Sequence, residues 1–176
     1  LSLIKEGYDV VAISMHDEYS ENLKALGCQC VNINIDSGGK NPFKDLKIII
    51  QLFRLFREIS PFVVLHFTPK ICIYSSIACH LNGIPFISNI SGLGIITSKG
   101  VLLSILVKFL YKFSQKKAAK IFFQNESDRS NFVDLGIVPS NITDRLPGSG
   151  VDLNYFSVER HEKNANIKFI LVARML

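Results

Sequence analysis

The chain has 176 residues, which is enough for one domain with a sizeable core, and its 48% hydrophobic and 20% charged residues are ordinary for a soluble globular protein. No apolar run reaches the roughly 18 residues that a membrane-spanning helix needs, which excludes a span of that kind. The four cysteines stand in mainly apolar settings and indicate a reducing compartment.

The net charge of +5 is concentrated in one stretch of the chain. Residues 99–120 contain six lysines and no acidic residue, so the rest of the chain carries −1. A local cluster predicts a partner at one face rather than general nucleic-acid binding. Lysines spaced by four residues predict one row along a helix. Each lysine near an anionic membrane surface adds about 1 kcal/mol to the free energy of binding. The row consists of Lys108, Lys112, Lys116 and Lys120, and the alternative is the solvated back of a helix.

Helices and strands alternate along the sequence. Helical spacing of apolar residues, β-branched runs and Gly, Pro and Asn signals define them. In chain order we expect a helix end at 1–7, a strand at 8–13, a helix at 18–26, a strand at 28–35, a helix at 42–59 with Asn41 as its N-cap, a strand at 62–66, a helix at 71–81, a strand at 84–88, a helix at 99–118, a strand at 120–124, a helix at 127–135, a loop at 139–145 and a strand at 167–173. This alternation predicts a parallel, doubly wound α/β sheet.

We expect the chain to be truncated at both ends. Residues 1–7 read as the end of a helix with no strand before it, and the chain stops soon after the strand at 167–173. The prediction is therefore a domain over 1–156 that lacks its first strand, a polar linker over 157–166, and the first strand of a second domain over 167–176.

Three polar turns follow predicted strands, at 66–70, 89–94 and 124–128. Because the carboxyl ends of parallel strands lie at one edge, where ligands bind in open α/β sheets, we expect these turns to lie together. Gly92 and Gly94 allow the backbone to turn sharply and approach a ligand closely. The alternative is that all three are ordinary connections between strands and helices.

The first of these turns carries the most chemistry. His66 at a strand end can position a hydroxyl or a phosphate, and Lys70 can meet a phosphate as a point charge. The alternative is a histidine that is hydrogen-bonded within a wall of the core. The cysteine spacings do not match a zinc site, so we expect no metal and interpret the cysteines as small buried side chains.

The ordered motifs resemble the N-terminal half of a GT-B glycosyltransferase of the family 4 type, in the branch that builds lipid-linked bacterial surface polysaccharides and glycans. They span residues 62–174 and follow one another in the order 66–70, 82–85, 89–94, 122–125 with Asp128, 147–152 with Phe156, and 172–174.

The resemblance implies two Rossmann-like domains that face each other across a cleft. The N-terminal domain would bind an acceptor, here a polyprenyl-diphosphate-linked saccharide at the membrane, and the C-terminal domain would bind the nucleotide-sugar donor. Many relatives carry a histidine in the turn after the strand at 84–88, where this chain has Ser91. His66, Asn89 or Ser91 is therefore expected to serve as the catalytic group.

The resemblance also implies contacts for both substrates. Arg174 matches the start of an Arg-then-Lys pair that grips the donor diphosphate. The residues expected to contact the acceptor are Thr68, Lys70, Gly92, Gly94, Asn125 and Glu126.

The predicted function is transfer of a hexose or N-acetylhexosamine with retention of configuration, without a cofactor or an obligatory metal, at the cytoplasmic face of the membrane. Because the donor half would be missing, we expect the fragment alone to be inactive. Two alternatives remain: a non-catalytic, membrane-associated partner in polysaccharide assembly, and a nucleotide-sugar epimerase of the same architecture.

Overall fold

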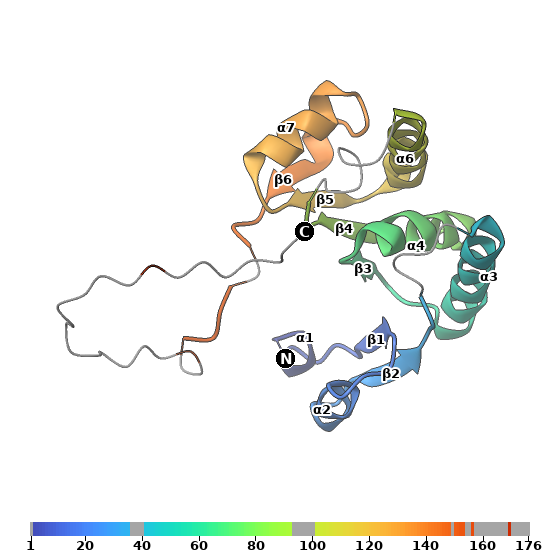
Figure 1. Ribbon diagram of the computed structural model, residues 1–176. Coiled ribbons are helices and arrows are strands. Elements are labelled where there is room, and N and C mark those ends of the chain that lie inside the picture. Colours follow the sequence, from blue (N-terminus) through green and yellow to red (C-terminus); the bar gives the residue numbers. More distant parts are fainter. Residues whose placement is uncertain are drawn as a thin grey trace.

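The computed structural model describes residues 2–35, 41–92, 101–148, 150–153, 156 and 169. These residues form an α/β fold with two parallel sheets, one of order β1-β2 and one of order β3-β4-β5-β6 (Figure 1). The α/β class with parallel strands is therefore confirmed. Within the described residues β1 pairs only with β2, and β3 pairs only with β4.

The two-stranded sheet is built from the first fifth of the chain. Val11 of β1 aligns with Gln29 of β2, and the pairing continues to the end of both strands. Gly27 closes the second helix with a φ of +93°, a conformation that favours glycine. The elements are α1 (Ser2–Lys5), β1 (Val11–Ser14), α2 (Ser20–Ala25) and β2 (Gln29–Asn32).

Helix α3 (Pro42–Ile59) begins and ends where the sequence predicts. The side-chain oxygen of Asn41 accepts hydrogen bonds from the backbone N–H groups of Phe43 and Lys44, at 3.0 and 3.4 Å. The helix ends at Ser60, which has a left-handed backbone with a φ of +50°. Its buried face consists of Ile48, Leu52 and Phe56.

The larger sheet alternates with helices over the rest of the described chain. Its elements are β3 (Val64–His66), α4 (Pro69–Asn82), β4 (Phe86–Ile90), α6 (Val101–Ser114), the 3-10 turn η1 (Gln115–Lys117), β5 (Lys120–Phe123), α7 (Glu126–Asp134), the 3-10 turn η2 (Ser140–Ile142) and β6 (Thr143–Arg145).

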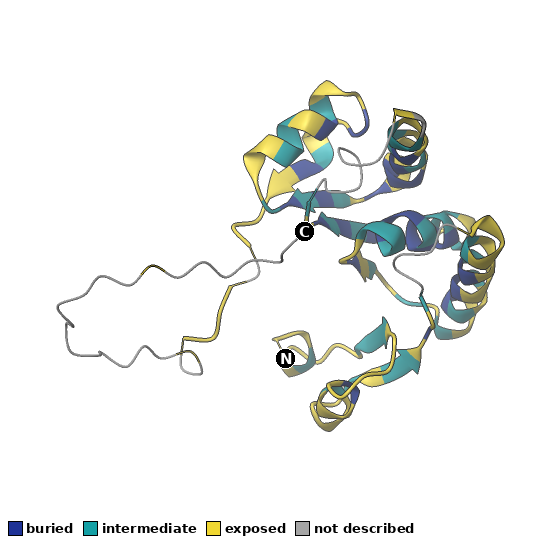
Figure 2. Cartoon of the chain, in the orientation of Figure 1, coloured by how far each residue is buried: buried dark blue, intermediate teal, exposed yellow. Residues whose placement is uncertain are grey.

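The core lies on the face of this sheet that α4, α6 and α7 cover, and it continues past α4 to the buried residues of α3 (Figure 2). Phe123 of β5 and Tyr111 of α6 both meet Phe132 of α7 edge-on, with ring centroids 5.1 and 5.3 Å away. Because β4 and β5 are buried at every second residue, the sheet has a second, less covered face.

Several predicted boundaries were wrong, and β1, for example, begins three residues later than the strand predicted at 8–13. Strand β4 begins and ends two residues later than 84–88, so Asn89 lies in the strand. The predicted loop 139–145 contains β6, which pairs with β5. The helix predicted over 99–118 ends at Ser114 and continues as η1. The predicted linker and, apart from Phe169, the predicted last strand lie outside the described residues.

Candidate functional site

The carboxyl ends of β3, β4 and β5 lie at one edge of the larger sheet. His66 of β3 aligns with Ser88 of β4, and Ile90 of β4 aligns with Phe123 of β5, all in parallel register. The prediction that the three polar turns share one edge is confirmed. We call this edge the strand-end rim, and it comprises the residues directly after the three strands, 67–68, 91–92 and 124–125.

His66 lies beneath the rim and not on its surface, because its side chain is only 1% exposed. Its Nε2 is 2.8 Å from the Ser75 hydroxyl, and its Nδ1 is 3.3 Å from the hydroxyls of both Ser76 and Ser88. The ring stacks on Phe86 with centroids 5.3 Å apart. Burial lowers the pKa of His66 from 6.5 to about 4, so the imidazole is neutral near pH 7.

The hydrogen bonds around His66 also define its tautomer. The Ser76 hydroxyl donates its one proton to the Cys72 carbonyl at 2.6 Å, so it can only accept from His66. The proton therefore sits on Nδ1, and Nε2 accepts from Ser75. The Gln115 amide donates to the same Cys72 carbonyl at 2.6 Å and to the Ser76 hydroxyl at 3.0 Å. This buried network ties β3 and β4 to α4 and η1, which makes His66 a residue that positions the rim.

The turn after β3 leads directly into α4. Thr68 is exposed in the N-cap position, but its side chain makes no capping hydrogen bond. The Lys70 ammonium lies 3.4 Å from the Asp45 carboxylate of α3, and both side chains are mostly buried. Burial and the neighbouring Asp45 carboxylate raise the pKa of Tyr74. The Asp45 carboxylate thus joins the first turns of α3 and α4.

The last residues of β4 and the turn after it hold an unsatisfied polar group and a glycine. Among the described residues, the Asn89 side-chain oxygen is buried and has no hydrogen-bond partner. Such an acceptor costs about 1–3 kcal/mol unless a donor reaches it. Ser91 is exposed, and Gly92 adopts a φ of +144° with nothing within 4 Å of the position that a Cβ would occupy. Gly94 lies outside the described residues.

The turn after β5 has local structural roles that the sequence alone did not reveal. The Asn125 side-chain oxygen accepts from the backbone N–H of Asp128 at 2.8 Å, so Asn125 caps α7. Glu126 forms an ion pair with Arg129 at 2.6 Å. Both residues remain exposed at the rim, and their contact with an acceptor stays a prediction.

The four lysines do not form one helical row, so that prediction was wrong. Lys108 and Lys112 lie on α6, but Lys116 lies in η1 and Lys120 begins β5. Lys120 is 3.5 Å from Asp144 of β6 and pairs with it. A constant spacing of four residues gives one row only while the α-helix continues, and α6 ends at Ser114.

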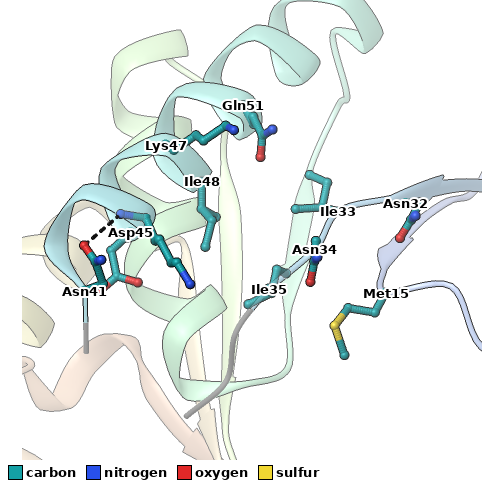
Figure 3. Close-up of a pocket in the computed structure, with 11 residues that line it drawn as sticks. Met15, Asn32, Ile33, Asn34, Ile35, Asn41, Asp45, Lys47, Ile48 and Gln51 are labelled. Carbon is teal, nitrogen blue, oxygen red and sulfur yellow. Dashed lines mark hydrogen bonds between the residues drawn. The ribbon is translucent and has the colours of Figure 1, made fainter. Parts of the chain in front are cut away.

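A hollow of about 820 Å³ lies between the end of β2 and the first half of α3, and sequence reasoning missed it (Figure 3). Amide, lysine and apolar side chains share its wall. They are Met15, Asn32, Ile33, Asn34, Ile35, Asn41, Lys44, Asp45, Lys47, Ile48 and Gln51. The signal was available, because polar residues also follow the strand predicted at 28–35, as they follow the other three strands.

No three His, Cys, Asp or Glu side chains within the described ranges are grouped to hold a metal ion. Burial raises the pKa of Cys72 and of Cys79 to about 12, so both thiols are protonated near neutral pH. Arg174, the predicted contact of the donor diphosphate, lies outside the described residues.

Sequence comparison gives one family and one curated relative. The family described as glycosyl transferase 4-like matches residues 1–125. The chain is similar to the N,N'-diacetylbacillosaminyl-diphospho-undecaprenol alpha-1,3-N-acetylgalactosaminyltransferase of Campylobacter jejuni, with 26% identity over 185 residues. The similarity covers 96% of this chain and 49% of the relative, so the chain spans about half of the relative's length.

Solved structures share the fold at low identity. A glycosyltransferase from Rickettsia africae has a TM-score of 0.67 and 17% identity, over 89% of this chain and 38% of that one. MurG from Acinetobacter baumannii has a TM-score of 0.55 and 15% identity, over 86% and 40%. A UDP-GlcNAc 2-epimerase from Neisseria meningitidis has a TM-score of 0.51 and 18% identity, over 77% and 37%.

Proposed function

Because the chain belongs to the glycosyl transferase 4-like family, we propose that it forms the acceptor-binding side of a retaining glycosyltransferase. The enzyme transfers a hexose or N-acetylhexosamine from a nucleotide-sugar to a polyprenyl-diphosphate-linked saccharide. The single observation that carries this proposal is the family match over residues 1–125, which includes all three turns of the strand-end rim. The Campylobacter relative supports the acceptor class, since its name specifies an undecaprenol diphosphate.

The rim supplies the groups that the acceptor needs. Ser91 and Asn125 are exposed and offer a hydroxyl and an amide to sugar hydroxyls. Gly92 lets the acceptor approach the backbone because nothing in the described part of the chain lies within 4 Å of the position that a Cβ would occupy. His66 acts from beneath by fixing the strand ends through its serine contacts. The role of these groups is to orient the acceptor hydroxyl, and orientation is a major source of catalysis in transfer reactions.

The hollow beside α3 extends the same surface toward β2. Asn34 offers an amide, and Lys44 and Lys47 offer ammonium groups from the wall of the hollow. Amides hydrogen-bond sugar hydroxyls, and ammonium groups attract the diphosphate. We therefore assign the hollow to the saccharide or diphosphate of the acceptor.

The donor side of the proposal concerns the rest of the enzyme. Arg174 contacts the donor diphosphate, the reaction retains the anomeric configuration, and no metal is obligatory. The enzyme works as a peripheral protein at the cytoplasmic face of an anionic membrane, where its lipid-linked acceptor lies. Lys108, Lys112 and Lys116 face that surface, whereas Lys120 is held by Asp144.

The test compares the chain 1–176 with the whole protein encoded by its gene. Each is incubated with short-chain polyprenyl-diphosphate saccharides and a panel of UDP-hexoses and UDP-N-acetylhexosamines. We expect transfer by the whole protein, an α-linked product from an α-linked donor, and no transfer by the chain alone. An inverted product would refute retention, and transfer by the chain alone would refute the two-domain requirement.

A second candidate is a nucleotide-sugar epimerase, because epimerases of this architecture are among the similar structures. It predicts that the whole protein converts free UDP-N-acetylhexosamine without any lipid acceptor. Conversion of the free nucleotide-sugar with no transfer product would favour it. A whole protein that shows neither reaction would favour the third candidate, a non-catalytic assembly partner.

A further inference from the structure

Helix α6 carries apolar side chains on its outer face as well as on its inner face. The inner face is buried through Val107, Tyr111 and Ser114. The outer face consists of side chains that are between 52% and 77% exposed. We call it the α6 apolar face, and it comprises Val101, Ile105, Leu106, Phe109 and Phe113.

These side chains form one continuous stripe. At 3.6 residues per turn the five residues fall within an arc of about 140° of the helix surface. Helices that are apolar on all sides are normally covered on all sides, by protein or by lipid. An exposed apolar patch of this kind therefore marks an interaction surface.

The charges around the stripe identify what covers it. Lys112 falls within the same arc of α6, and Lys116 and Lys117 follow in η1. All three lysines are exposed. No acidic residue occurs between positions 99 and 120. An apolar stripe whose neighbouring charges in the sequence are all lysines complements a bilayer with anionic headgroups, since the acyl chains receive the apolar side chains and the phosphates receive the ammonium groups.

We propose that the α6 apolar face inserts into the interface of an anionic phospholipid bilayer, with Ile105, Phe109 and Phe113 among the acyl chains and Lys112 and Lys116 at the phosphates. None of the helices in the described part of the chain combines the length and apolar character needed to cross a bilayer. The helix therefore lies in the interface plane. Contact by lysines alone would be abolished by salt, whereas insertion of the apolar stripe leaves a salt-resistant component.

The position of α6 connects this surface to the strand-end rim. The helix follows β4, whose carboxyl end forms the middle of the rim, and Val101 is at the end of the helix that is nearer to β4 in the chain. A bilayer on the α6 apolar face thus presents its lipids to the rim from one side. This last step rests on the proposed function, because it takes the acceptor to be lipid-linked, but insertion itself does not.

The first experiment uses the absence of tryptophan from the chain. Phe109→Trp places a single fluorophore in the stripe, and Phe62→Trp places one at a phenylalanine that is 88% exposed elsewhere. Both proteins are mixed with vesicles of phosphatidylglycerol and phosphatidylcholine, with and without brominated acyl chains. We expect a blue shift and bromine quenching for Trp at position 109 only. The same solvent-exposed emission at both positions would overturn the proposal.

The second experiment measures binding by vesicle sedimentation. Ile105→Ser, Phe109→Ser and Phe113→Ser each remove one buried side chain from the interface, so each should weaken partitioning about tenfold. The matched control is Phe43→Ser, because Phe43 is 82% exposed and lies outside the stripe. Unchanged partitioning of all three variants would overturn insertion. A wild-type dimer that these variants convert to a monomer, with vesicle binding intact, would assign the stripe to a second copy of the chain instead.

Transferase assays separate this proposal from the proposed function. In the whole protein, the stripe variants should lose transfer to acceptors embedded in vesicles and keep transfer to short-chain acceptors in detergent. If the whole protein shows no transfer on any acceptor, the proposed function fails, and the tryptophan and sedimentation results still decide insertion.

Discussion

Acid should destabilise this fold through His66, and the size of the effect follows from its surroundings. Its pKa falls from an ordinary value of 6.5 to about 4 because burial disfavours the imidazolium. The unfolded chain therefore binds a proton that the folded chain does not accept, so stability is full above pH 6.5 and falls as the pH drops toward 4. The shift corresponds to about 3 kcal/mol of unfolding free energy over that window.

The assay is urea unfolding of the wild type and of His66→Gln between pH 7.5 and about 4. The variant should be less stable at neutral pH, because its amide cannot reproduce both serine contacts, and it should lose about 3 kcal/mol less than the wild type on acidification. His16→Gln is the matched control for a histidine-to-glutamine change at an exposed position. Parallel pH profiles for the wild type and His66→Gln would refute the buried neutral imidazole. His80 also has a lowered pKa from burial and from Lys117, so only the difference between proteins isolates His66.

Three further predictions concern stability and are read by chemical denaturation. Asn41→Ala should cost about 1 kcal/mol by removing the cap of α3, whereas Asn41→Asp should cost little, and equal losses would contradict the capping role. Phe132→Ala should cost about 3–5 kcal/mol, because Phe132 is fully buried between Phe123 and Tyr111, and a loss below about 1 kcal/mol would show that the α7 contact is loose. Gly92→Ala should cost about 1–3 kcal/mol from backbone strain at its φ of +144°, although nothing crowds the new methyl group, and an unchanged midpoint would contradict that strain.

The sequence predicted helices best where the signal is local. Asn41 and Pro42 define the start of α3, and Ser60 and Pro61 define its end. Each of these signals depends on neighbours within two turns, so no knowledge of the tertiary structure is needed. The family resemblance was also recoverable, because it rests on the order of short motifs and not on their contacts.

Strand β6 was not predicted because it depends on pairing with a strand that is distant in the sequence. Thr143–Arg145 is only three residues long, has no apolar alternation, and exists through its pairing with β5. The shift of β4 has the same origin. Asn89 is polar and was assigned to a turn, yet it aligns with Phe122 of β5 and completes the ladder. The ends of a strand depend on the neighbouring strands with which it pairs, and a single sequence does not show which strands pair.

The shared edge of the three turns was predicted, because the order of the strands alone brings the turns together. The exposure of the individual side chains was not predicted. His66 is buried by serines that lie 9 to 22 residues away in the chain, and small residues such as Ser75 and Ser76 indicated only close packing of α4. The hollow beside α3 depends on the position of α3 relative to β2, and no local sequence pattern determines that position. Arg174, which is predicted to contact the donor diphosphate, lies outside the described residues.

Two neighbouring helices depart from the usual pattern in which apolar side chains are buried and polar side chains are exposed. The two departures differ in their free-energy cost. Helix α4 buries polar groups, but Ser75 and Ser76 both have hydrogen-bond partners, so their desolvation is offset. Helix α6 leaves more than half of Phe109 and of Phe113 exposed, although the Phe113 ring also contacts His80 of α4. A buried polar network can persist in an isolated protein, whereas an apolar stripe in water gains free energy from any surface that covers it. Burial of the α6 apolar face therefore supplies the free energy that favours binding to a bilayer. The lysines beside it favour a bilayer with anionic headgroups.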